Sequence, residues 1–493
     1  MTTTGLPTSD PLAQLGRIHL IGVGGAGMSA LTRMLCARGA PVSGSELRES
    51  RILAPMRARM RDSRSILAPM RALGAVIHLG QRSDSLPDVD TVVVSTAIRD
   101  DNPEVVAARE RGLRVLHRAE ALAFCMRSRT SVVVVGTHGK TTTTSMLAVA
   151  LQHCGADPSF YIGAQLNETG TNAHAGSGKI FVAESDESDG SFLVLNPDIA
   201  VVTNVEADHL DHWGTAGAVH DAFDEFIERV PLDGLVVACA DDPGASLAAE
   251  YARRSGRSVL TYGENASADV RITGLELFAS GSSFEPVIRG RRQPRVALRV
   301  MGKHNVLNAA AALAAGIGLG YAVNDMSDGL QLYTGVRRRF EFKGEADSVK
   351  VFDDYAHHHS EIRATLETAR QIASGARLVV AFQPLRFTRT AMFHRELGEA
   401  LGLADDVVVL EVYGSNEIPI PGATGALVAA AVPLPSKHVR FEPSFSAVAP
   451  WLVARARPGD LVLTLGDGIV TTLGPEVVEL LGDRERNGRG GRG

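Results

Sequence analysis

The sequence predicts an α/β protein with parallel sheets, organised as three domains. Short runs of β-branched residues alternate along the chain with stretches of helical character, as in sheets whose strands are joined by helices. Two of these runs lead directly into glycine-rich turns. The length of 493 residues is enough for three domains of roughly 100–200 residues each, and each of these is large enough to bury its own core.

The first part of the chain contains a strand, a glycine turn and a helix in succession. After a polar leader, Arg17 to Ile21 is the expected strand, Gly22 to Gly27 the turn, and Met28 to Ala37 the helix. Pro41 to Ser45 is the next expected strand, and it ends at Glu46.

A second unit of the same kind begins near Ser131. Val132 to Val135 is β-branched throughout, which is typical of a strand buried on both faces of a parallel sheet. This run ends in a second glycine turn, Gly136 to Thr143. Similar runs predict further strands: Val92 to Val94, Ile199 to Thr203, Leu235 to Val237, Leu378 to Ala381, Val407 to Leu410 and Leu461 to Leu465.

Two changes of pattern indicate the domain boundaries. The first lies near residues 117–130, before the second glycine turn, and the second near 334–340, where Gly335 to Phe340 interrupts the alternation. The expected domains are residues 1–120, 121–335 and 336–482. The tail, residues 483–493, is rich in Arg and Gly without apolar anchors, so we expect it to be disordered.

A short repeat and an alanine-rich segment have separate explanations. Ile52 to Ala58 recurs as Ile66 to Ala72 at an offset of 14 residues, which indicates a local tandem duplication and a tolerated insertion rather than a site. Its prolines argue against one continuous helix. Ala309 to Val323 is rich in Ala and Gly and lacks the apolar character of a membrane span, so we expect a packed helix.

The composition excludes several classes of protein. Lys plus Arg number 50 against 56 Asp plus Glu, and the resulting net charge of −6 disfavours a nucleic-acid-binding protein. The N-terminus lacks the basic start and apolar run of a signal peptide. Cys36, Cys125, Cys154 and Cys239 show no disulfide or zinc spacing, which favours a reducing, cytoplasmic setting.

The second glycine turn has the features of a phosphate-binding loop. It follows a buried strand, its glycines let backbone N–H groups face an anion, Lys140 can meet β- and γ-phosphates, and Thr141 can bind Mg²⁺ at a helix start. Only two residues separate its glycines, where four are usual. The alternative is a glycine turn with a solvated lysine. The candidate ATP-binding residues are Gly136, Thr137, His138, Gly139, Lys140, Thr141 and Thr142.

The first glycine turn fits the pattern G-x-G-x-x-G of dinucleotide-binding proteins. Gly22, Gly24 and Gly27 provide the glycines, and Glu46 lies where a carboxylate would meet a ribose. Alone, this pattern favours a nicotinamide-dependent oxidoreductase. Because the chain contains a second phosphate loop, the first could instead bind a different diphosphate. A purely structural turn is the third interpretation.

Acidic residues and histidines follow two of the expected strands downstream of the phosphate loop. They lie in the segments Glu184 to Asp189 and Glu206 to His212. Carboxylate and imidazole groups at strand ends can complete the coordination of Mg²⁺ where phosphates leave positions open. We interpret most of these carboxylates, Asp186 and Glu187 among them, as solvated or capping groups.

Seven separated motifs, taken in order, resemble the Mur ligase family of peptidoglycan synthesis. They are GVGGAGMS, GTHGKTTTT, AESDESDGSF, TNVEADHLDH, GKHNVLNAAAA, DDYAHHHSEI and FQPLRFTRT. The resemblance spans about residues 15–480. Its order and number of motifs are specific, because a shared fold alone would not reproduce them.

This resemblance implies a Rossmann-like N-terminal domain for a UDP-sugar, a central P-loop ATPase-type α/β domain, and a Rossmann-like C-terminal domain for an amino acid. It implies an ATP-dependent ligase that phosphorylates the lactyl carboxylate of UDP-N-acetylmuramate, with L-alanine attacking the acyl phosphate. ATP and Mg²⁺ are the implied cofactors. We expect no nucleic-acid or membrane partner, and the oligomeric state stays open between a monomer and a weak homodimer.

The resemblance also assigns roles in ATP and metal binding. Lys140 is implied to be catalytic, and Thr141, Glu184 and His209 are implied to bind Mg²⁺. Asn305 matches the position that recognises adenine, and Asp354 matches a contact to the nucleotide ribose. The residues Arg337 to Arg339 form either a solvated basic turn or a phosphate contact, and Arg338 is our candidate for ATP.

The remaining assignments concern the other two substrates. The implied amino-acid-binding residues are Tyr355, His357, Arg386 and Arg389, the last three of which are also implied to be catalytic. The implied UDP-sugar-binding residues are Gly22, Gly24, Gly25, Ala26, Gly27 and Glu46. On this view the dinucleotide pattern binds the UDP diphosphate without a nicotinamide cofactor.

Four features depart from the family pattern. His359 stands in place of a proline, Leu385 in place of the histidine usual before Arg386, and Asp467 in place of a small residue in a glycine turn. The fourth feature is the internal repeat. These departures keep open a non-catalytic nucleotide-binding relative. The close rival within the class is the ligase that reattaches recycled murein tripeptide to the same UDP-sugar.

Overall fold

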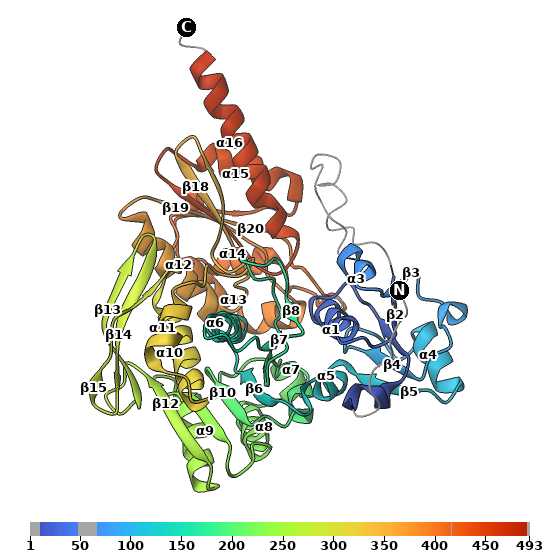
Figure 1. Ribbon diagram of the computed structural model, residues 1–493. Coiled ribbons are helices and arrows are strands. Elements are labelled where there is room, and N and C mark those ends of the chain that lie inside the picture. The colour runs from blue at the N-terminus through green and yellow to red at the C-terminus, as the bar shows by residue number, and fades with distance from the viewer. Residues whose placement is uncertain (1–9, 48–66, 416, 491–493) are drawn as a thin grey trace. The chain divides into compact units, whose positions relative to one another are not determined.

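A computed structural model describes residues 10–47, 67–415 and 417–490 and divides the chain into two compact units. The first unit comprises the chain up to residue 275 with 284–298 and 306–334. The second comprises 276–283, 299–305 and the chain from 335 onward. The described strands form three sheets, and the predicted α/β class with parallel sheets is confirmed (Figure 1).

The first sheet is entirely parallel, with the order β3-β2-β1-β4-β5. Its strands are β1 (Ile18–Ile21), β2 (Val42–Glu46), β3 (Val76–Leu79), β4 (Thr91–Val94) and β5 (Arg114–His117). Its helices are α1 (Ala26–Ala37), α3 (Ala68–Ala72), α4 (Pro103–Glu110) and α5 (Arg118–Met126). Strand β1 is buried throughout, which explains its central place in the sheet.

The second sheet contains eleven described strands, in the order β15-β14-β13-β12-β11-β10-β6-β9-β7-β8, with β16 paired to β14. Its strands are β6 (Thr130–Val135), β7 (Ser159–Tyr161), β8 (Ala173–His174), β9 (Ile180–Glu184), β10 (Ile199–Val202), β11 (Leu235–Cys239), β12 (Ser258–Gly263), β13 (Val270–Phe278), β14 (Gly281–Ile288), β15 (Arg291–Arg292) and β16 (Val296–Leu298). Its helices are α6 (Lys140–His153), α7 (Leu210–Trp213), α8 (Ala216–Glu228), α9 (Pro243–Arg254), α10 (Lys303–Gly318) and α11 (Val323–Leu330). The four valines of β6 are fully buried, as the sequence predicts.

The third sheet has the order β17-β18-β22-β19-β20-β21, and only its β17–β18 pair is antiparallel. Its strands are β17 (Glu341–Ala346), β18 (Val349–Asp354), β19 (Leu378–Phe382), β20 (Asp406–Val409), β21 (Val439–Phe441) and β22 (Leu461–Leu465). Its helices are α12 (His359–Ala373), α13 (Phe387–Leu401), α14 (Gly425–Ala431), α15 (Phe445–Arg455) and α16 (Leu473–Gly490). Two separate apolar clusters cover its two faces, one from α12 to α14 and one from α15 and α16.

The strands predicted from β-branched runs are all present, with ends shifted by one or two residues. The alanine-rich segment is a packed helix, α10, whose residues Ala309 to Ala315 are fully buried. The chain then turns at Gly320 before α11 begins at Val323. The first copy of the internal repeat, Ile52 to Ala58, lies outside the described residues. The described part of the second copy forms α3, with a proline in its first turn, where a missing N–H costs no helical bond.

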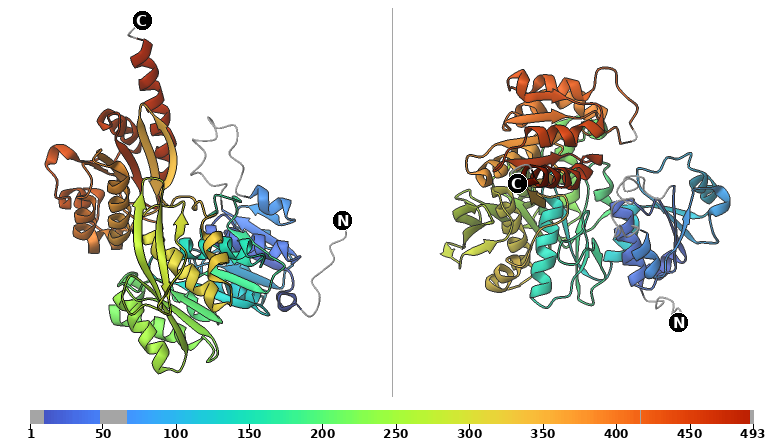
Figure 2. Two further views of the ribbon diagram at one scale, coloured as in Figure 1. Left: turned by 60° about the vertical axis from the view of Figure 1, so that its left-hand side comes forward. Right: turned by 90° about the horizontal axis from the view of Figure 1, so that it is seen from above.

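The expectation of a disordered tail from residue 483 is wrong over the described residues. Helix α16 continues to Gly490, and its last turns extend beyond the third sheet (Figure 2). Leu481 is fully buried. Arg484 donates to the carbonyls of Val453 and Ala456 at the end of α15 and pairs with Asp347 at 2.6 Å. These long-range contacts hold the polar segment in place, and a composition argument cannot detect them.

The three sheets follow the order of the three expected domains, whose limits stay a prediction. The first sheet ends at His117 and the second begins at Thr130. None of the helices within the described ranges combines the length and the apolar character that a membrane span requires. All four cysteines are free.

The role of Arg484 can be tested with a matched pair of variants. Replacing Arg484 by Ala should lower the free energy of unfolding of the third-sheet region by about 1–2 kcal/mol, because two carbonyls and a carboxylate lose their donor. Trp451 fluorescence during urea unfolding, in a Trp213→Phe background, reports on this region. Arg486→Ala is the control, since Arg486 is exposed and Asp483 is its one ion-pair partner among the described residues, and it should cost less than about 0.5 kcal/mol. Equal effects of the two variants would contradict the anchoring role.

Candidate active site

The glycine turn after β6 is shaped by close contacts that leave no room for side chains. Gly136 has a φ of 132°, and a Cβ there would lie 2.2 Å from Thr203 Oγ1. Gly139 has a φ of 81°, and a Cβ there would lie 2.5 Å from Asn308 Oδ1. Both positions therefore require glycine, for backbone conformation and for space.

The loop is fixed by the segment that follows β10. Asn204 accepts from the backbone N–H of His138 at 2.7 Å, and its carbonyl accepts from the N–H of Thr137 at 3.1 Å. The hydroxyl of Thr137 in turn accepts from the N–H of Glu206 at 2.9 Å. Helix α6 then begins at Lys140 without a side-chain cap. A rigid glycine loop leading into an uncapped helix N-terminus is suited to bind phosphate groups.

Lys140 is held at the centre of this loop. Its Nζ atom donates to the carbonyl of Gly136 at 2.6 Å and to the carboxylate of Glu187 at 2.7 Å. Desolvation opposes the charged form of Lys140, but Glu187 and Asp186 outweigh it and raise the pKa of Lys140. A permanent ammonium group in a glycine loop can neutralise charge on phosphates.

The interpretation of Glu187 as a solvated or capping residue is wrong. Its side chain is only 4% exposed and forms the ion pair with Lys140. Asp186 is exposed and accepts from the N–H of Ser188 at 3.2 Å in a local turn. The run of acidic residues conceals this difference, because which carboxylate turns inward depends on the loop after β9.

One group of potential metal ligands lies beside the phosphate loop. Ligand atoms of Asp186, Glu187 and His209 lie within 4.8 Å of one another. His209 has a φ of 53° and directly precedes α7. Its ring nitrogen Nε2 lies 3.9 Å from a carboxylate oxygen of Glu187. Thr141 lies in the first turn of α6. Glu184, the other predicted ligand, lies at the end of β9 against Gly163 and is not a member of this group. Carboxylate oxygens with one imidazole fit a divalent cation such as Mg²⁺.

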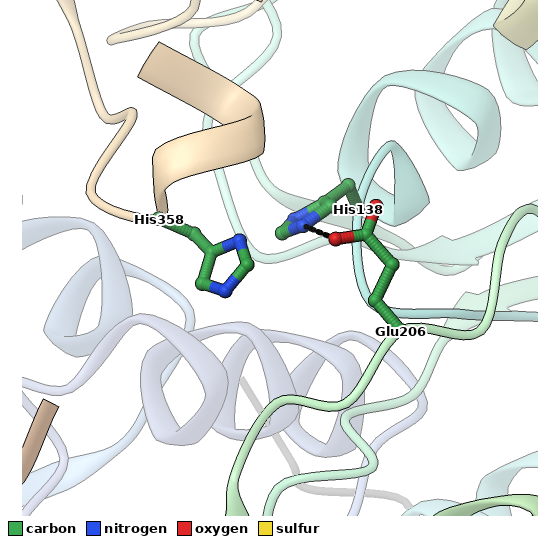
Figure 3. Close-up of side chains that lie close together, drawn as sticks. All are labelled: His138, Glu206 and His358. Atoms are coloured by element: carbon green, nitrogen blue, oxygen red, sulfur yellow. Dashed lines mark ion pairs between the residues drawn. The ribbon is translucent and has the colours of Figure 1, made fainter. Parts of the chain in front are cut away.

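His138 turns toward the segment after β10. Figure 3 shows its ring pointing at the carboxylate of Glu206, with Nε2 3.5 Å from the nearer oxygen. His358 in the same picture belongs to the second unit and is described with α12 below. The backbone N–H of His138 donates to Asn204, and its ring faces Glu206. Both contacts tie the loop to the segment that follows β10.

The glycine turn after β1 is closed by the predicted carboxylate. Gly22 has a φ of 79°, and Glu46 accepts from the N–H of Gly24 at 2.6 Å. A Cβ on Gly27 would lie 2.7 Å from Tyr161 Oη and 3.0 Å from Arg118 Nη1. Gly25 is the N-cap of α1, which begins at Ala26, two residues before the predicted start at Met28. The turn therefore lies beside a cation, Arg118, which the sequence analysis missed.

In the second unit, two adjacent aspartates end strand β18. Asp353 is fully buried and accepts from the hydroxyls of Thr464 and Thr471 at 2.6 and 2.7 Å. Asp354 accepts from the N–H groups of Phe340 and Ala356, both at 2.7 Å. Burial raises the pKa of Asp354 to about 6, although Arg339 and these two donors act in the opposite direction. Asp354, which the resemblance implies as a contact to the nucleotide ribose, thus holds the backbone at Phe340 and at Ala356.

The histidines after β18 start helix α12. His358 and Glu361 form a capping box at its N-terminus. His359 is the first helical residue, a position favoured by proline because its N–H has no partner within the helix. The change to histidine therefore leaves the helix start intact.

His357 lies just before this helix. Its Nδ1 lies 3.0 Å from the carbonyl of Tyr355, and the two rings meet edge to face at 5.1 Å. Burial lowers the pKa of His357, and Arg389 lowers it further, while Glu361 and Asp467 act in the opposite direction. Three predicted amino-acid-site residues, Tyr355, His357 and Arg389, are thus neighbours.

The remaining predicted residues of this unit have varied surroundings. Arg386 precedes α13 with a φ of 61°, and its N–H donates to the carbonyl of Tyr413 at 2.9 Å. Leu385 is buried beside it. Asn305 donates to the carbonyl of Met301 at 2.7 Å.

Arg338 bonds to groups of the second unit, to which it belongs. Its guanidinium donates to the carbonyls of Gly466 and Asp467. It also lies 3.6 Å from a carboxylate oxygen of Asp353. Its contact with ATP stays a prediction.

Asn308 is a further residue that the sequence analysis missed. It accepts from the Thr143 hydroxyl at 3.2 Å and packs against Gly139. It lies three residues after Asn305, one turn further along α10. The motif GKHNVLN contains this spacing, and a helical reading of it could have found Asn308.

Three family models match the chain. They are described as Mur ligase family, catalytic domain, over residues 17–59 and 60–130, Mur ligase middle domain over 134–316, and Mur ligase, glutamate ligase domain over 338–468. Together they cover most of the chain and include all three sheets.

Curated proteins and solved structures are similar over the whole length. The UDP-N-acetylmuramate--L-alanine ligase of Acidothermus cellulolyticus is 54% identical, covering 96% of this chain and 96% of its own. The ligase of the same name from Saccharopolyspora erythraea is 52% identical, covering 95% and 94%. The crystal structure of the UDP-N-acetylmuramate-alanine ligase from Thermotoga maritima matches with a TM-score of 0.76 and 29% identity, covering 95% of this chain and 99% of that one.

The buried carboxyl of Asp354 has a consequence for stability. Its pKa is about 6 in the folded chain against an ordinary value of 3.8, so folding favours the protonated form. Between about pH 4 and pH 6 the folded state binds more protons than the unfolded state, and the free energy of unfolding should fall by about 3 kcal/mol as the pH rises. Asp354→Asn should remove this slope in urea unfolding followed by Trp451 fluorescence. The exposed control, Asp483→Asn, should keep it, and an unchanged slope in Asp354→Asn would refute the assignment.

Proposed function

The chain belongs to the Mur ligase family, and we propose that it joins L-alanine to the lactyl carboxylate of UDP-N-acetylmuramate at the expense of ATP. It is an amide-forming ligase of peptidoglycan synthesis. The observation that carries this conclusion is the 54% identity, over 96% of both chains, to a ligase of that name. The site geometry gives each of its residues a chemical task.

Activation of the carboxylate falls to the phosphate loop. A carboxylate is a poor electrophile, and transfer of the γ-phosphoryl group of ATP converts it to an acyl phosphate with a good leaving group. The transferring phosphoryl group is stabilised mainly by positioning and by nearby positive charge. Lys140 supplies that charge, and the phosphates compete with Glu187 for its ammonium group.

The metal site of this proposal adjoins the same lysine. Asp186, Glu187 and His209 would hold Mg²⁺, with Thr141 at the helix start and Glu184 as a further proposed ligand. The ion would supply additional positive charge to the phosphates. Because Glu187 belongs to this group and also pairs with Lys140, its carboxylate links the metal site to the loop.

The second step needs an amine that has lost its proton. The carbonyl of Tyr355 can only accept, so Nδ1 of His357 carries the proton and Nε2 is left as an acceptor. Burial lowers the pKa of His357, which keeps its ring neutral near pH 7. We assign it as the base that takes the proton from the attacking amine. The amine nitrogen bonds to the acyl carbon, and phosphate leaves.

The remaining assignments concern recognition. Arg386 and Arg389 suit the carboxylate of the amino acid. The turn from Gly22 to Gly27 suits the UDP diphosphate, and Arg118 beside it would add a positive charge. Asn305 and Asp354 remain our candidates for the adenine and ribose of ATP. A cytoplasmic location agrees with four free cysteines, and we propose a monomer or weak homodimer.

The alternatives are not favoured. A nicotinamide-dependent oxidoreductase has no use for a second phosphate loop with its own lysine and acidic group. A non-catalytic relative would have no need to keep Lys140, Glu187 and His209 together. The relatives at 52–54% identity bear the name of the L-alanine ligase rather than of a murein tripeptide ligase.

Phosphate release tests the proposal directly. With Mg-ATP and UDP-N-acetylmuramate, the purified protein should release phosphate only when L-alanine is added, and murein tripeptide should not replace L-alanine. Lys140→Ala should slow this release at least about 100-fold, because transition-state charge loses a preorganised partner. The matched control, exposed Lys437→Ala, should retain full activity. Phosphate release with tripeptide but not with L-alanine, or no release with either amine, would overturn the proposal.

A further inference from the structure

The glycine turn after β22 offers a single place for a side chain. A Cβ on Gly466 would lie 2.5 Å from the carbonyl oxygen of Gln383, and one on Gly468 would lie 2.4 Å from Gln383 Oε1. Gly466 also has a φ of 129°, which disfavours other residues. Only position 467 can project a group from this turn, and the chain has an aspartate there.

The turn lies at the carboxyl end of a central strand of the third sheet. Strand β22 lies between β18 and β19, and the N–H of Gly466 donates to the carbonyl of Asp354 at 3.1 Å. Asp467 therefore lies next to Tyr355, the residue that follows Asp354. Ligand-binding residues of parallel sheets gather at this edge.

The Asp467 carboxylate has two partners of different kinds. One of its oxygens lies 3.6 Å from Nη1 of Arg338, and its charge adds to burial in raising the pKa of the Tyr355 phenol. The guanidinium of Arg338 in turn lies 4.9 Å from the centre of the Tyr355 ring. The three side chains thus form one group in which the carboxylate pairs with the guanidinium and the guanidinium packs on the face of the phenol ring.

Arg338 is itself immobilised in this arrangement. It donates to the carbonyls of Gly466 and Asp467 and approaches the buried carboxylate of Asp353 at 3.6 Å. A movable partner would hold the phenol only loosely. A cation fixed by two carbonyls and two carboxylates gives the Tyr355 ring one orientation.

The orientation of Tyr355 matters for the neighbouring histidine. The rings of Tyr355 and His357 meet at an interplanar angle of 88° with centroids 5.1 Å apart. The carbonyl of Tyr355 fixes the proton on Nδ1 of His357. A rotation of the phenol would remove the edge against which the imidazole packs. Asp467 is 27% exposed, and its charge acts on His357.

We propose that Asp467 is a positioning residue of the amino-acid site, which acts through Tyr355 to orient His357 toward the amine of the incoming amino acid. This inference rests on the proposed function and adds a residue to it. The carboxylate has two separable effects, namely a partner for Arg338 beneath the Tyr355 ring and a negative charge near His357.

The charge effect has a defined sign. The groups facing His357 are Glu361 from α12, Arg389 from α13, Asp467 from the turn after β22, and the carbonyl of Tyr355. Among these, Glu361 and Asp467 raise the pKa of His357, and Arg389 lowers it. Loss of the Asp467 charge lowers this pKa, so the acid limb of a pH profile moves to lower pH.

The experiment compares Asp467→Ala, Asp467→Asn and Tyr355→Phe by steady-state kinetics with L-alanine as the varied substrate. Asp467→Ala should lower kcat/KM for L-alanine about tenfold, with the KM value of UDP-N-acetylmuramate unchanged. Asp467→Asn keeps an acceptor for Arg338, so it should recover most of kcat/KM at neutral pH. Both should move the acid limb of the kcat/KM profile to lower pH. Asp483→Ala, an exposed aspartate of the same unit, is the control.

The combination Asp467→Ala with Tyr355→Phe separates positioning from general damage. If Asp467 acts through the tyrosine, the double variant should be no worse than the poorer single variant, whereas independent effects would multiply. Multiplied effects, equal losses for all three substrates, or an unmoved acid limb would each overturn the inference. Alanine-dependent release by the wild-type chain is measured alongside. Its absence would refute the proposed function, whereas its presence with unaffected Asp467 variants would refute only this inference.

Discussion

A steric constraint marks the three places where we propose that substrates bind. In each of the three sheets, a central parallel strand runs into a glycine turn in which a Cβ would crowd an atom of another segment. The obstructing atom lies 2.7 Å away at Gly24, 2.2 Å away at Gly136 and 2.5 Å away at Gly466. Strands β1, β6 and β22 each lie between two parallel neighbours, which is where connections diverge and ligands bind in such sheets.

A carboxylate accompanies each of these turns. Glu46 accepts from the N–H of Gly24, Glu187 pairs with Lys140 of the second turn, and Asp467 in the third turn pairs with Arg338. Backbone donors and cations gathered at strand ends need acceptors, and these side chains provide them. A substrate that binds at one of these turns must therefore displace the carboxylate, share its partner or contact it. The three proposed binding regions therefore share one arrangement of a glycine turn and a carboxylate.

Much of the fold could be predicted, because burial on both faces of a parallel sheet leaves a direct mark on the sequence. The valines of β6 and the run of β22 are such marks, and the glycine turns after β1 and β6 are visible from spacing. Contacts between distant segments leave no such mark. Arg484 anchors a polar helix to the end of α15, and composition alone predicted disorder there. Glu187 is buried beside the exposed Asp186 because the loop after β9 turns it inward. Asp467 was visible as a departure, but its partners Arg338 and Tyr355 come from other segments of the chain.

The central claim is that the loop after β6 binds the phosphates of ATP through a lysine that Glu187 also engages. The most direct test is calorimetric titration of ADP without metal into the wild-type chain and into Glu187→Gln. We expect Glu187→Gln to bind ADP about tenfold more tightly, since the phosphates no longer compete with a charge-assisted bond of about 1.5 kcal/mol or more. Asp186→Asn, the exposed neighbour, should change the affinity less. Equal or weaker binding by Glu187→Gln would contradict the account.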